Sequence, residues 1–456
     1  MKSSIFDQAG PPLPQGLGRR GFLKGLGGLG VMGGVGGGFL PSLATAGGEP
    51  DPEGPIFVLI HQAGGNDTLN TVIPVDTADS SHYYLGRPDL ALNAGEVLPL
   101  QDGLGFHPGL AQLKGLWDSG DLAIINGVGN PNAVLSHFRS IDIWEGADPA
   151  ASTGSGWLGR YFEHQCEGAG EFDSKIGIDV RTAASLAFRT PGNDAALTIQ
   201  NPQFFDYLSA EGTLPLAPGF DEVLRKGFVS GLVDRGNPSS GALEYVTSTL
   251  KAALGGSDAV QSALTTAAED EDEPAFPGSA IGVSLRNVAR YIGGGMPTST
   301  YFLTQGGYDT HGGQYLLDSA GRPLAGKHAG LLSSLDGAVG AFATEMKRQG
   351  VWDRVVVMVY SEFSRKIVQN GSGGTDHGAA GAVLIAGGQT QSGLYGAYPS
   401  LAPEDRILNG SMPMTTDFRR IYRTILERWY GLSATDAATL LRIPVSEHQP
   451  LDFLTS

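Results

Sequence analysis

Short runs of consecutive apolar residues recur along the chain, and segments with helical spacing separate them. The clearest runs lie at 56–60, 122–128, 300–304, 354–360 and 382–386. Apolar residues on successive positions are typical of strands that are buried on both faces of a sheet. Strands that alternate with helices favour a largely parallel sheet. The expected fold class is therefore α/β, with a central, mainly parallel β-sheet flanked by helices on both faces.

The predicted helices differ in how clearly the sequence marks them. Residues 327–348 carry a stripe of apolar side chains on one side, which predicts one long amphipathic helix. Shorter helical patterns lie at 110–119, 416–429 and 434–442. Residues 170–300 mix short strands with helices. We therefore expect a single domain over 47–456, in which 170–300 forms a helix-rich insertion or subdomain.

The first 46 residues have the pattern of an export signal. Arg19 and Arg20 precede Gly-Phe-Leu-Lys, and a weakly apolar stretch at 25–40 leads to Ala-Thr-Ala ending at Ala46. This order is typical of a twin-arginine signal peptide. The stretch is too short and too rich in glycine for a membrane span, so no stable membrane anchor is expected. We expect recognition by the twin-arginine export machinery, cleavage after Ala46, and a periplasmic or secreted product.

The composition of the chain excludes several classes of protein. The 456 residues carry a formal net charge of −17, are 41% hydrophobic and include 69 glycines and one cysteine. A net negative surface repels phosphate backbones, so no nucleic-acid partner is expected. A single cysteine excludes an internal disulfide scaffold. The apolar content is sufficient for a buried core, which excludes a disordered polyanion.

Polar residues with metal-binding chemistry follow three of the apolar runs. Asp67 lies in a glycine-rich loop after 56–60, Asp309 and His311 follow 300–304, and Glu362 follows 354–360; His377 instead precedes 382–386. The carboxyl ends of parallel strands meet at one edge of a sheet. Positions two apart in extended chain point to the same side, which favours Asp309 and His311 as joint ligands. Imidazole and carboxylate ligands suit zinc or a similar divalent metal.

Each of these residues also has an ordinary structural interpretation. Asp67 could cap a turn or a helix, since aspartate is a good N-cap residue. Glu362 could pair with Arg365, three residues later, because an unpaired carboxylate behind an apolar strand is costly. The remaining two segments could be a plain polar turn and a plain loop. These alternatives stay open at the level of sequence.

Ser136 is the candidate nucleophile. It begins a helical segment after the run at 122–128, and a hydroxyl at a helix start gains from the positive end of the helix dipole. A metal ion could lower its pKa enough for attack on phosphorus or sulfur. The alternative is a plain N-cap. His137 is not expected to serve as its base, because neighbouring residues of a helix point apart. The sequence contains no G-x-S-x-G elbow of serine hydrolases.

A series of short blocks, taken in order, resembles a family of bacterial exported proteins called domain of unknown function 1501. The blocks include the twin-arginine segment, the run from Phe57 through Asp67 to Pro74, Ser136-His137-Phe138, Gly307-Tyr308-Asp309-Thr310-His311, Ser361-Glu362-Phe363-Ser364-Arg365, Gly374-Thr375-Asp376-His377-Gly378 and Thr416-Asp417-Phe418-Arg419. The resemblance spans essentially the whole chain after the signal.

The resemblance implies a place in the alkaline phosphatase and sulfatase superfamily, and hence an alkaline-phosphatase-like α/β domain. It also implies a metal-dependent hydrolase of small anionic phosphate or sulfate esters, with one or two divalent ions, possibly zinc. Ser136 then stands where the nucleophile would lie, and Arg139 and Arg365 could hold the oxyanion bidentately. The ligand set implied is Asp67, Asp309, His311, Glu362 and His377.

One departure from the superfamily pattern supports a second function class. Phe363 follows Glu362 where a histidine ligand usually stands, and it cannot bind a metal. The alternative is therefore a non-catalytic envelope or secretion-associated binding protein with a partly lost metal site. The formylglycine mechanism of sulfatases is excluded, because Cys166 is the only cysteine and lacks the required Cys-x-Pro-x-Arg context.

Overall fold

A computed structural model describes residues 54–150, 154–166, 177–181, 185–190, 193–194, 196–199, 260–265, 272–296, 298–319 and 321–455. The export signal expected over residues 1–46 lies outside the described residues. So do most of the insertion expected at 170–300 and the side chain of Cys166.

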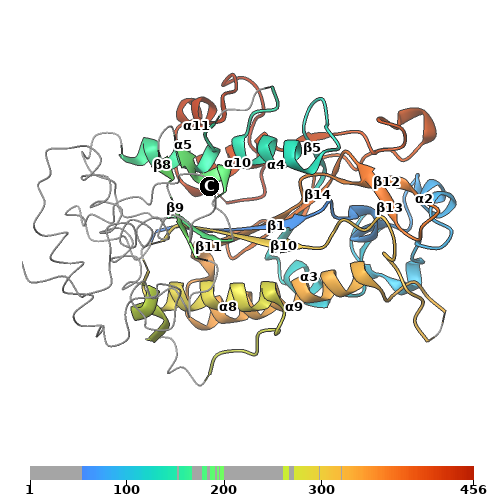
Figure 1. Ribbon diagram of the computed structural model, residues 1–456, viewed down its shortest axis with the longest axis horizontal. Helices are drawn as coiled ribbons and strands as arrows, with labels where there is room; N and C mark the ends of the chain where they lie inside the picture. Colours follow the sequence, from blue (N-terminus) through green and yellow to red (C-terminus); the bar gives the residue numbers. More distant parts are fainter. Residues whose placement is uncertain are drawn as a thin grey trace, which may run out of the picture.

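A nine-stranded sheet forms the centre of the molecule (Figure 1). Its strands are β1 (Ile56–Ala63), β5 (Leu122–Gly129), β6 (Gly177–Val180), β9 (Ala196–Thr198), β10 (Thr300–Gly306), β11 (Val355–Tyr360), β14 (Gly381–Gly387), β15 (Gly393–Tyr395) and β16 (Thr416–Asp417). They are ordered β15-β5-β14-β11-β1-β10-β6-β9, and β16 also pairs with β5. All five predicted apolar runs are strands of this sheet.

Most neighbouring strands of the sheet run parallel, as predicted. β1 lies at the centre between β10 and β11, and both pairs are parallel. β14 is antiparallel to both of its neighbours, β11 and β5. The chain leaves β11 at its carboxyl end, forms a hairpin there and returns from the same edge, so β14 has to run backward. The carboxyl ends of β1, β10 and β11 therefore meet at one edge.

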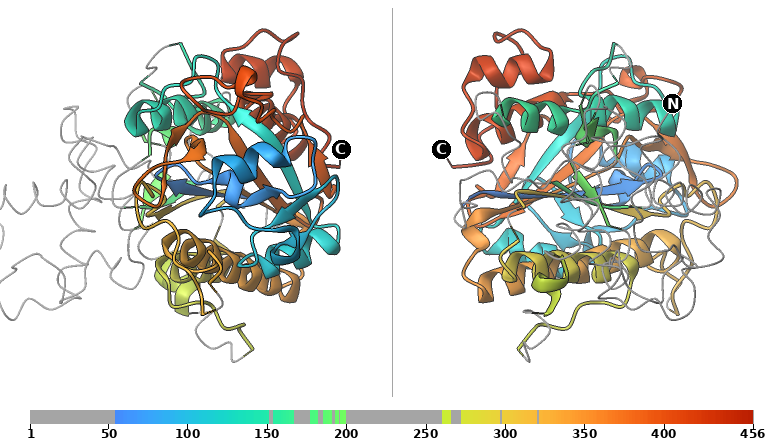
Figure 2. Two further views of the ribbon diagram at one scale, coloured as in Figure 1. Left: turned by 90° about the vertical axis from the view of Figure 1, so that its right-hand side faces the viewer. Right: turned by 60° about the vertical axis from the view of Figure 1, so that its left-hand side comes forward.

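Helices cover both faces of the sheet, which gives three layers (Figures 1 and 2). On one face lie α3 (Ala111–Asp118), α8 (Ala280–Gly293) and α9 (Lys327–Arg348). On the other lie α4 (His137–Gly146), α5 (Trp157–Cys166), α10 (Arg419–Thr424), which continues as a π-helical turn at Ile425–Trp429, and α11 (Ala434–Leu441). The α/β expectation is confirmed, and the bounds of α9 match the prediction.

The alternation of side chains along β1 shows how the two cores form. Val58 and Ile60 pack with the apolar side chains of α3, α8 and α9, whereas Phe57 and Leu59 pack with those of the opposite helices. A strand buried on both faces needs apolar residues at every position, which explains the continuous run in the sequence. Within the described residues, no helix is both long and apolar enough to cross a membrane.

Smaller elements complete the fold beyond the edge where β1, β10 and β11 end. The hairpin of β12 (Ser364–Gln369) and β13 (Thr375–Gly378) lies there beside α2 (Ser80–Gly86) (Figure 1). Two further small sheets combine β2 (Val72–Pro74), β3 (Leu98–Pro99) and β4 (Leu104–Phe106), and β7 (Arg189–Thr190) and β8 (Asn193–Asp194). Short 3₁₀ helices lie at Thr68–Asn70, Ala94–Glu96, Leu186–Phe188, Trp352–Arg354 and Pro403–Asp405. An ordinary loop was one interpretation of residues 375–378, and they instead pair as strand β13.

Candidate metal centre

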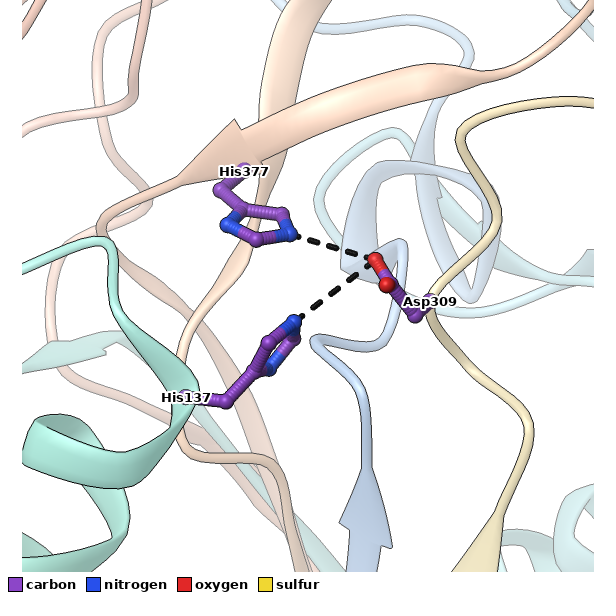
Figure 3. A group of neighbouring side chains, drawn as sticks. All are labelled: His137, Asp309 and His377. Carbon is purple, nitrogen blue, oxygen red and sulfur yellow. Dashed lines mark hydrogen bonds and ion pairs between the residues drawn. The ribbon is translucent and has the colours of Figure 1, made fainter.

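Four side chains from three separate parts of the chain converge past the carboxyl end of β10. Asp309 and His311 lie in the loop that follows this strand, His377 lies on β13, and His137 is the first residue of α4. We call these four residues the His–Asp cluster. Figure 3 shows the rings of His137 and His377, one above the other, both directed at the same carboxylate oxygen of Asp309.

The distances within the His–Asp cluster are short. Asp309 Oδ1 lies 3.1 Å from His377 Nε2, 3.1 Å from His311 Nε2 and 3.7 Å from His137 Nε2. The Nε2 atoms of His311 and His377 are 2.9 Å apart. Ligands bound at about 2.0–2.1 Å to one tetrahedral cation stand about 3.3 Å from one another. The ligand atoms of His137, Asp309 and His377 all lie within 4.8 Å of one another, close enough to bind one zinc-sized ion, and His311 Nε2 lies beside two of them.

Each histidine of the cluster directs its other ring nitrogen at an oxygen. His137 Nδ1 lies 2.7 Å from Glu362 Oε1, and His377 Nδ1 lies 2.9 Å from the carbonyl oxygen of Leu135. His311 Nδ1 lies 3.3 Å from Asp376 Oδ1. A carbonyl or an ionised carboxylate can only accept, so each Nδ1 carries the proton. Metal-binding histidines nearly always show this outer contact.

The consequence is that three unprotonated Nε2 atoms face one carboxylate oxygen. A neutral imidazole with its proton on Nδ1 has a lone pair on Nε2. The lone pairs of His311 and His377 would repel at 2.9 Å unless a cation or a proton lies between them. The Nε2 atom of His137 is buried and has no hydrogen-bond partner within the described part of the chain. The arrangement suits a divalent cation.

Asp309 is the only carboxylate of the cluster, and Arg365 fixes its position. The guanidinium Nη2 donates to Asp309 Oδ1 at 2.7 Å. Burial raises the pKa of Asp309, but the hydrogen bond and charge of Arg365 outweigh it and hold the pKa at about 2. Asp309 is therefore ionised throughout the physiological range. Its side chain is 50% exposed, so the cluster is open to solvent and to a ligand.

Arg365 lies too deep to take the oxyanion-binding role expected of it. The side chain is fully buried. Besides Asp309, its nitrogens donate to the carbonyl oxygens of Gly64, Gly65, Tyr308 and Thr375. The guanidinium thus ties together the loops after β1 and β10 and the start of β13. It builds the cluster and is not presented to a substrate.

Glu362 lies behind the cluster and not in it. Oε1 accepts hydrogen bonds from His137 and from the amide of Gly64, and Oε2 accepts from His61 Nε2 at 2.9 Å. Burial raises the pKa of Glu362, but the hydrogen bond and charge of His61 and the hydrogen bond from His137 outweigh it and hold the pKa at about 2. The expected partner, Arg365, binds Asp309 instead. Glu362 reaches the candidate metal position only through His137.

Phe363 packs against the cluster on a third side. Its ring centroid is 4.8 Å from that of His137 and 4.7 Å from that of His377. Gly65 has a φ of +78°, and a Cβ there would lie 2.5 Å from the Phe363 ring. The residue that cannot bind a metal thus serves as an apolar support for two imidazoles that can. This contact needs glycine at position 65.

Asp67 lies apart from the His–Asp cluster, in a closed network that we call the Asp67 cluster. Its Oδ2 accepts from Arg87 Nη1 at 2.6 Å and from Gln314, and both members of the ion pair are fully buried. Burial raises the pKa of Asp67, but the charge and hydrogen bond of Arg87 outweigh this effect and hold the pKa below its ordinary value. His328 is buried nearby and contacts Asn66 Oδ1 at 2.8 Å. The sequence anticipated neither Arg87 nor this pairing.

Ser136 and Arg139 flank the cluster at the start of α4. Ser136 is the N-cap residue, but its side chain makes no capping hydrogen bond, and it is exposed. The capping alternative therefore receives no support from its contacts. Arg139 donates to the carbonyl of Pro149 at 3.3 Å and is partly exposed. No contact between Arg139 and the four ligand atoms is found among the residues that the structure describes.

His137 is the ligand candidate that sequence reasoning missed. Its neighbour Ser136 attracted attention, and the rule that adjacent helix residues point apart set His137 aside. That rule applies to residues within a helix, whereas here Ser136 is the N-cap residue and His137 is the first residue of α4. The useful signal was the position itself, one residue into a helix that starts beside a strand edge rich in carboxylates and histidines.

Comparison with known proteins finds a family model that matches part of the chain. A model described as "Protein of unknown function (DUF1501)" matches residues 288–443, which confirms the resemblance over that range. No curated protein matches. Similar solved structures include a protein in the alkaline phosphatase superfamily from Vibrio parahaemolyticus, at 10% identity and a TM-score of 0.32, covering 83% of this chain and 71% of that one.

Two further similar structures belong to enzymes. The sulfatase PsFucS1 from Pseudoalteromonas sp. is 10% identical with a TM-score of 0.34, covering 96% of this chain and 75% of that one. The phosphonate monoester hydrolase SpPMH from Silicibacter pomeroyi is 11% identical with a TM-score of 0.34, covering 87% and 78%. At these TM-scores the likenesses carry no argument about the activity of this chain.

Proposed function

We propose that this chain, whose residues 288–443 match a family of proteins of unknown function, is a metal-dependent hydrolase of phosphate or sulfate esters. The observation that carries the proposal is the convergence of three bare imidazole nitrogens on one ionised carboxylate oxygen, with the shortest nitrogen–nitrogen separation at 2.9 Å. Catalytic zinc sites keep such a cluster accessible, and Asp309 and His311 are both about half exposed.

The proposed centre takes one cation. Of the ligands that a second ion would need, Asp67 is neutralised by buried Arg87, and Glu362 is engaged by His61 and His137. A guanidinium pairs with each aspartate, Arg87 with Asp67 and Arg365 with Asp309, but Asp309 is half exposed. Asp67 is fully buried, so a cation there would add like charge in a buried place. His137, Asp309, His311 and His377 remain as the ligand set, and their nitrogen and oxygen atoms suit zinc.

The surrounding residues suit ester hydrolysis. A divalent cation in this cluster would polarise an ester oxygen and lower the pKa of a nearby hydroxyl. Ser136 is exposed, makes no capping hydrogen bond and stands next to His137 in the chain. It also lies at the positive end of α4, which favours an anionic substrate group. We assign Ser136 the role of nucleophile.

The place of action belongs to the same proposal. The twin-arginine pattern before residue 46 supports export to the periplasm or beyond, through machinery that carries folded proteins. A fusion of residues 1–46 to a reporter tests this directly. Loss of reporter export in a variant with Arg19 and Arg20 both replaced by lysine is the expected result.

The test of function combines metal analysis with an ester panel. We expect close to one zinc per purified chain and turnover of aryl phosphate or aryl sulfate esters. Ser136→Ala should reduce kcat at least about 100-fold while leaving zinc content unchanged. Ser279→Ala is the matched control, because Ser279 is also an N-cap residue but starts α8 on the opposite face of the sheet.

The outcomes separate the two function classes. Zinc bound without turnover of any ester, and no effect of Ser136→Ala, would support the alternative of a non-catalytic binding protein. Absence of bound metal from protein that was purified without chelators and then supplied with zinc would refute both the hydrolase and the metal centre.

A further inference from the structure

We propose that Glu362 is a positioning residue, which sets the orientation and tautomer of His137 without binding the cation itself. The inference rests on the proposed metal centre and assigns a role within it. It differs from the sequence-based expectation, in which Glu362 was a ligand. The geometry around both of its carboxylate oxygens carries the argument.

Both oxygens of Glu362 are occupied by protein donors. Oε1 lies 2.7 Å from His137 Nδ1 and 2.9 Å from the amide nitrogen of Gly64, and Oε2 lies 2.9 Å from His61 Nε2. The side chain is 1% exposed. A cation would therefore have to displace a hydrogen bond from a desolvated carboxylate, which costs more than recruiting a half-exposed group such as Asp309.

The backbone of Glu362 is fixed as well. The indole Nε1 of Trp144 donates to its carbonyl oxygen at 2.9 Å. Trp144 belongs to α4, the same helix that begins with His137. The carboxylate and the imidazole that it holds are thus tied to each other twice, once through side chains and once through the helix. This connection locates His137 relative to the end of β11.

This contact determines that the lone pair of His137 lies on Nε2. An ionised carboxylate can only accept, so His137 carries its proton on Nδ1 and presents a bare Nε2. That Nε2 atom is buried and makes no hydrogen bond to any described residue, and it lies 3.7 Å from Asp309 Oδ1. A buried nitrogen acceptor without a partner is costly unless a ligand satisfies it.

The other two cluster histidines provide an internal comparison. Asp376 holds His311 in the same way, but its side chain is 47% exposed and the distance is 3.3 Å. A backbone carbonyl holds His377. Hydrogen bonds to a charged group are stronger where water is excluded. Glu362 should therefore contribute more to metal affinity than Asp376, although neither touches the cation.

Glu362→Gln tests this assignment without changing the size of the side chain. One amide oxygen cannot accept from both His61 and His137, so one imidazole loses its acceptor. We expect the zinc dissociation constant, measured on the metal-free full chain by competition with a chromophoric chelator, to rise about 10- to 100-fold. Asp376→Asn is the matched control, and its expected rise is less than about 5-fold.

A second measurement keeps the test valid if Glu362→Gln folds poorly. Long-range proton–nitrogen correlation spectra of the metal-free wild type should show His137 protonated on Nδ1 and bare on Nε2. Protonation on Nε2 would overturn the proposal. Equal zinc affinity of wild type and Glu362→Gln would also overturn it, while leaving the hydrolase proposal standing. A wild type that binds no zinc would instead refute the proposed function from which the inference starts.

Discussion

Two groups of charged side chains lie near the ends of β1 and β10, and they balance a carboxylate in opposite ways. In the Asp67 cluster, a buried guanidinium neutralises the carboxylate at 2.6 Å, and both partners are fully buried. In the His–Asp cluster, a guanidinium also pairs with the carboxylate at 2.7 Å, but that carboxylate is half exposed and three imidazoles surround it. An aspartate after a buried strand therefore does not define a metal ligand. The residues around the aspartate decide whether its carboxylate is buried or accessible to a metal ion.

A three-residue segment connects the two clusters. Asp309 and His311 face the open cluster, while Thr310 between them donates to Gln314, which in turn donates to Asp67. Alternate residues of an extended segment point to opposite sides, so one short segment serves both clusters. Structural and functional demands can thus be separated by mutation, if the two clusters are energetically independent.

The largest expected effect comes from breaking the closed cluster. Arg87→Met leaves the buried carboxylate of Asp67 uncompensated, which should reduce the free energy of unfolding by about 3–5 kcal/mol. Urea denaturation of the metal-free chain measures this loss of unfolding free energy. Adding Asp67→Leu in the same chain should recover part of the loss, because the buried charge is then gone.

The same variant tests whether the clusters are independent. Zinc affinity of folded Arg87→Met should stay within about 3-fold of the wild type, since separate sites usually behave additively. A large loss of zinc affinity with little loss of stability would mean that Asp67 belongs to the metal centre after all.

The converse change, Asp309→Asn, should affect binding and spare stability. Removing the only carboxylate of the open cluster should weaken zinc binding at least about 100-fold, more than the usual loss of an outer contact. The free energy of unfolding of the metal-free chain should fall less than in Arg87→Met, because Asp309 is half exposed and buried Arg365 keeps its carbonyl acceptors. Asp405→Asn, at an exposed aspartate, is the control and should change neither quantity. Equal zinc affinity in both variants would contradict the ligand assignment.

The contrast between the clusters also shows what the sequence could predict. The continuous apolar runs identified the strands and the periodic stripe identified α9, because burial on both faces and helical packing leave direct marks in the order of residues. The sequence of the hairpin formed by β12 and β13 shows neither a continuous apolar run nor a periodic apolar stripe. Arg365 stabilises the hairpin by binding carbonyl groups of β13 and of the loops after β1 and β10, a set of contacts that exists only after the sheet has formed.

The site was predictable where ligands are close in sequence. Asp309 and His311 are two positions apart, and their common direction follows from extended geometry. His137 and Glu362 are 225 positions apart, and their hydrogen bond depends on how α4 packs beside β11. Asp67 could be recognised as a carboxylate at a strand end, but its partner Arg87 follows from the placement of α2. Local spacing therefore predicted a pair, and tertiary packing decided the rest.

A smaller effect concerns the pH dependence of two buried histidines beside the Asp67 cluster, His107 and His328, whose ring centroids are 6.2 Å apart. Burial lowers the pKa of His107 to about 3 and that of His328 to about 4. Both are neutral in the folded chain, whereas the unfolded chain protonates them below about pH 6.5. The unfolded state then binds more protons, so stability is complete above pH 6.5 and falls as the pH drops toward 4.

Replacement of one histidine measures this contribution. His107→Gln should reduce the slope of the unfolding free energy between pH 6 and pH 4 by about 1.4 kcal/mol per pH unit, the value for one proton. Denaturation at several pH values gives the slope, which is insensitive to a constant packing loss. An unchanged slope would mean that His107 is protonated in the folded state as readily as in the unfolded one.

The smallest expected effect lies at the boundary between the clusters, at Gly65. Its positive φ strains any other residue, and a Cβ would lie 2.5 Å from the ring of Phe363, which supports His137 and His377. Gly65→Ala should therefore lower stability by about 1–3 kcal/mol and weaken zinc binding by less than about 10-fold. Gly307→Ala is the control, because its φ is also positive but a Cβ there meets no atom closer than 3.4 Å. If the two variants bind zinc equally well, the ring of Phe363 does not position the imidazoles, and backbone strain alone explains the glycine.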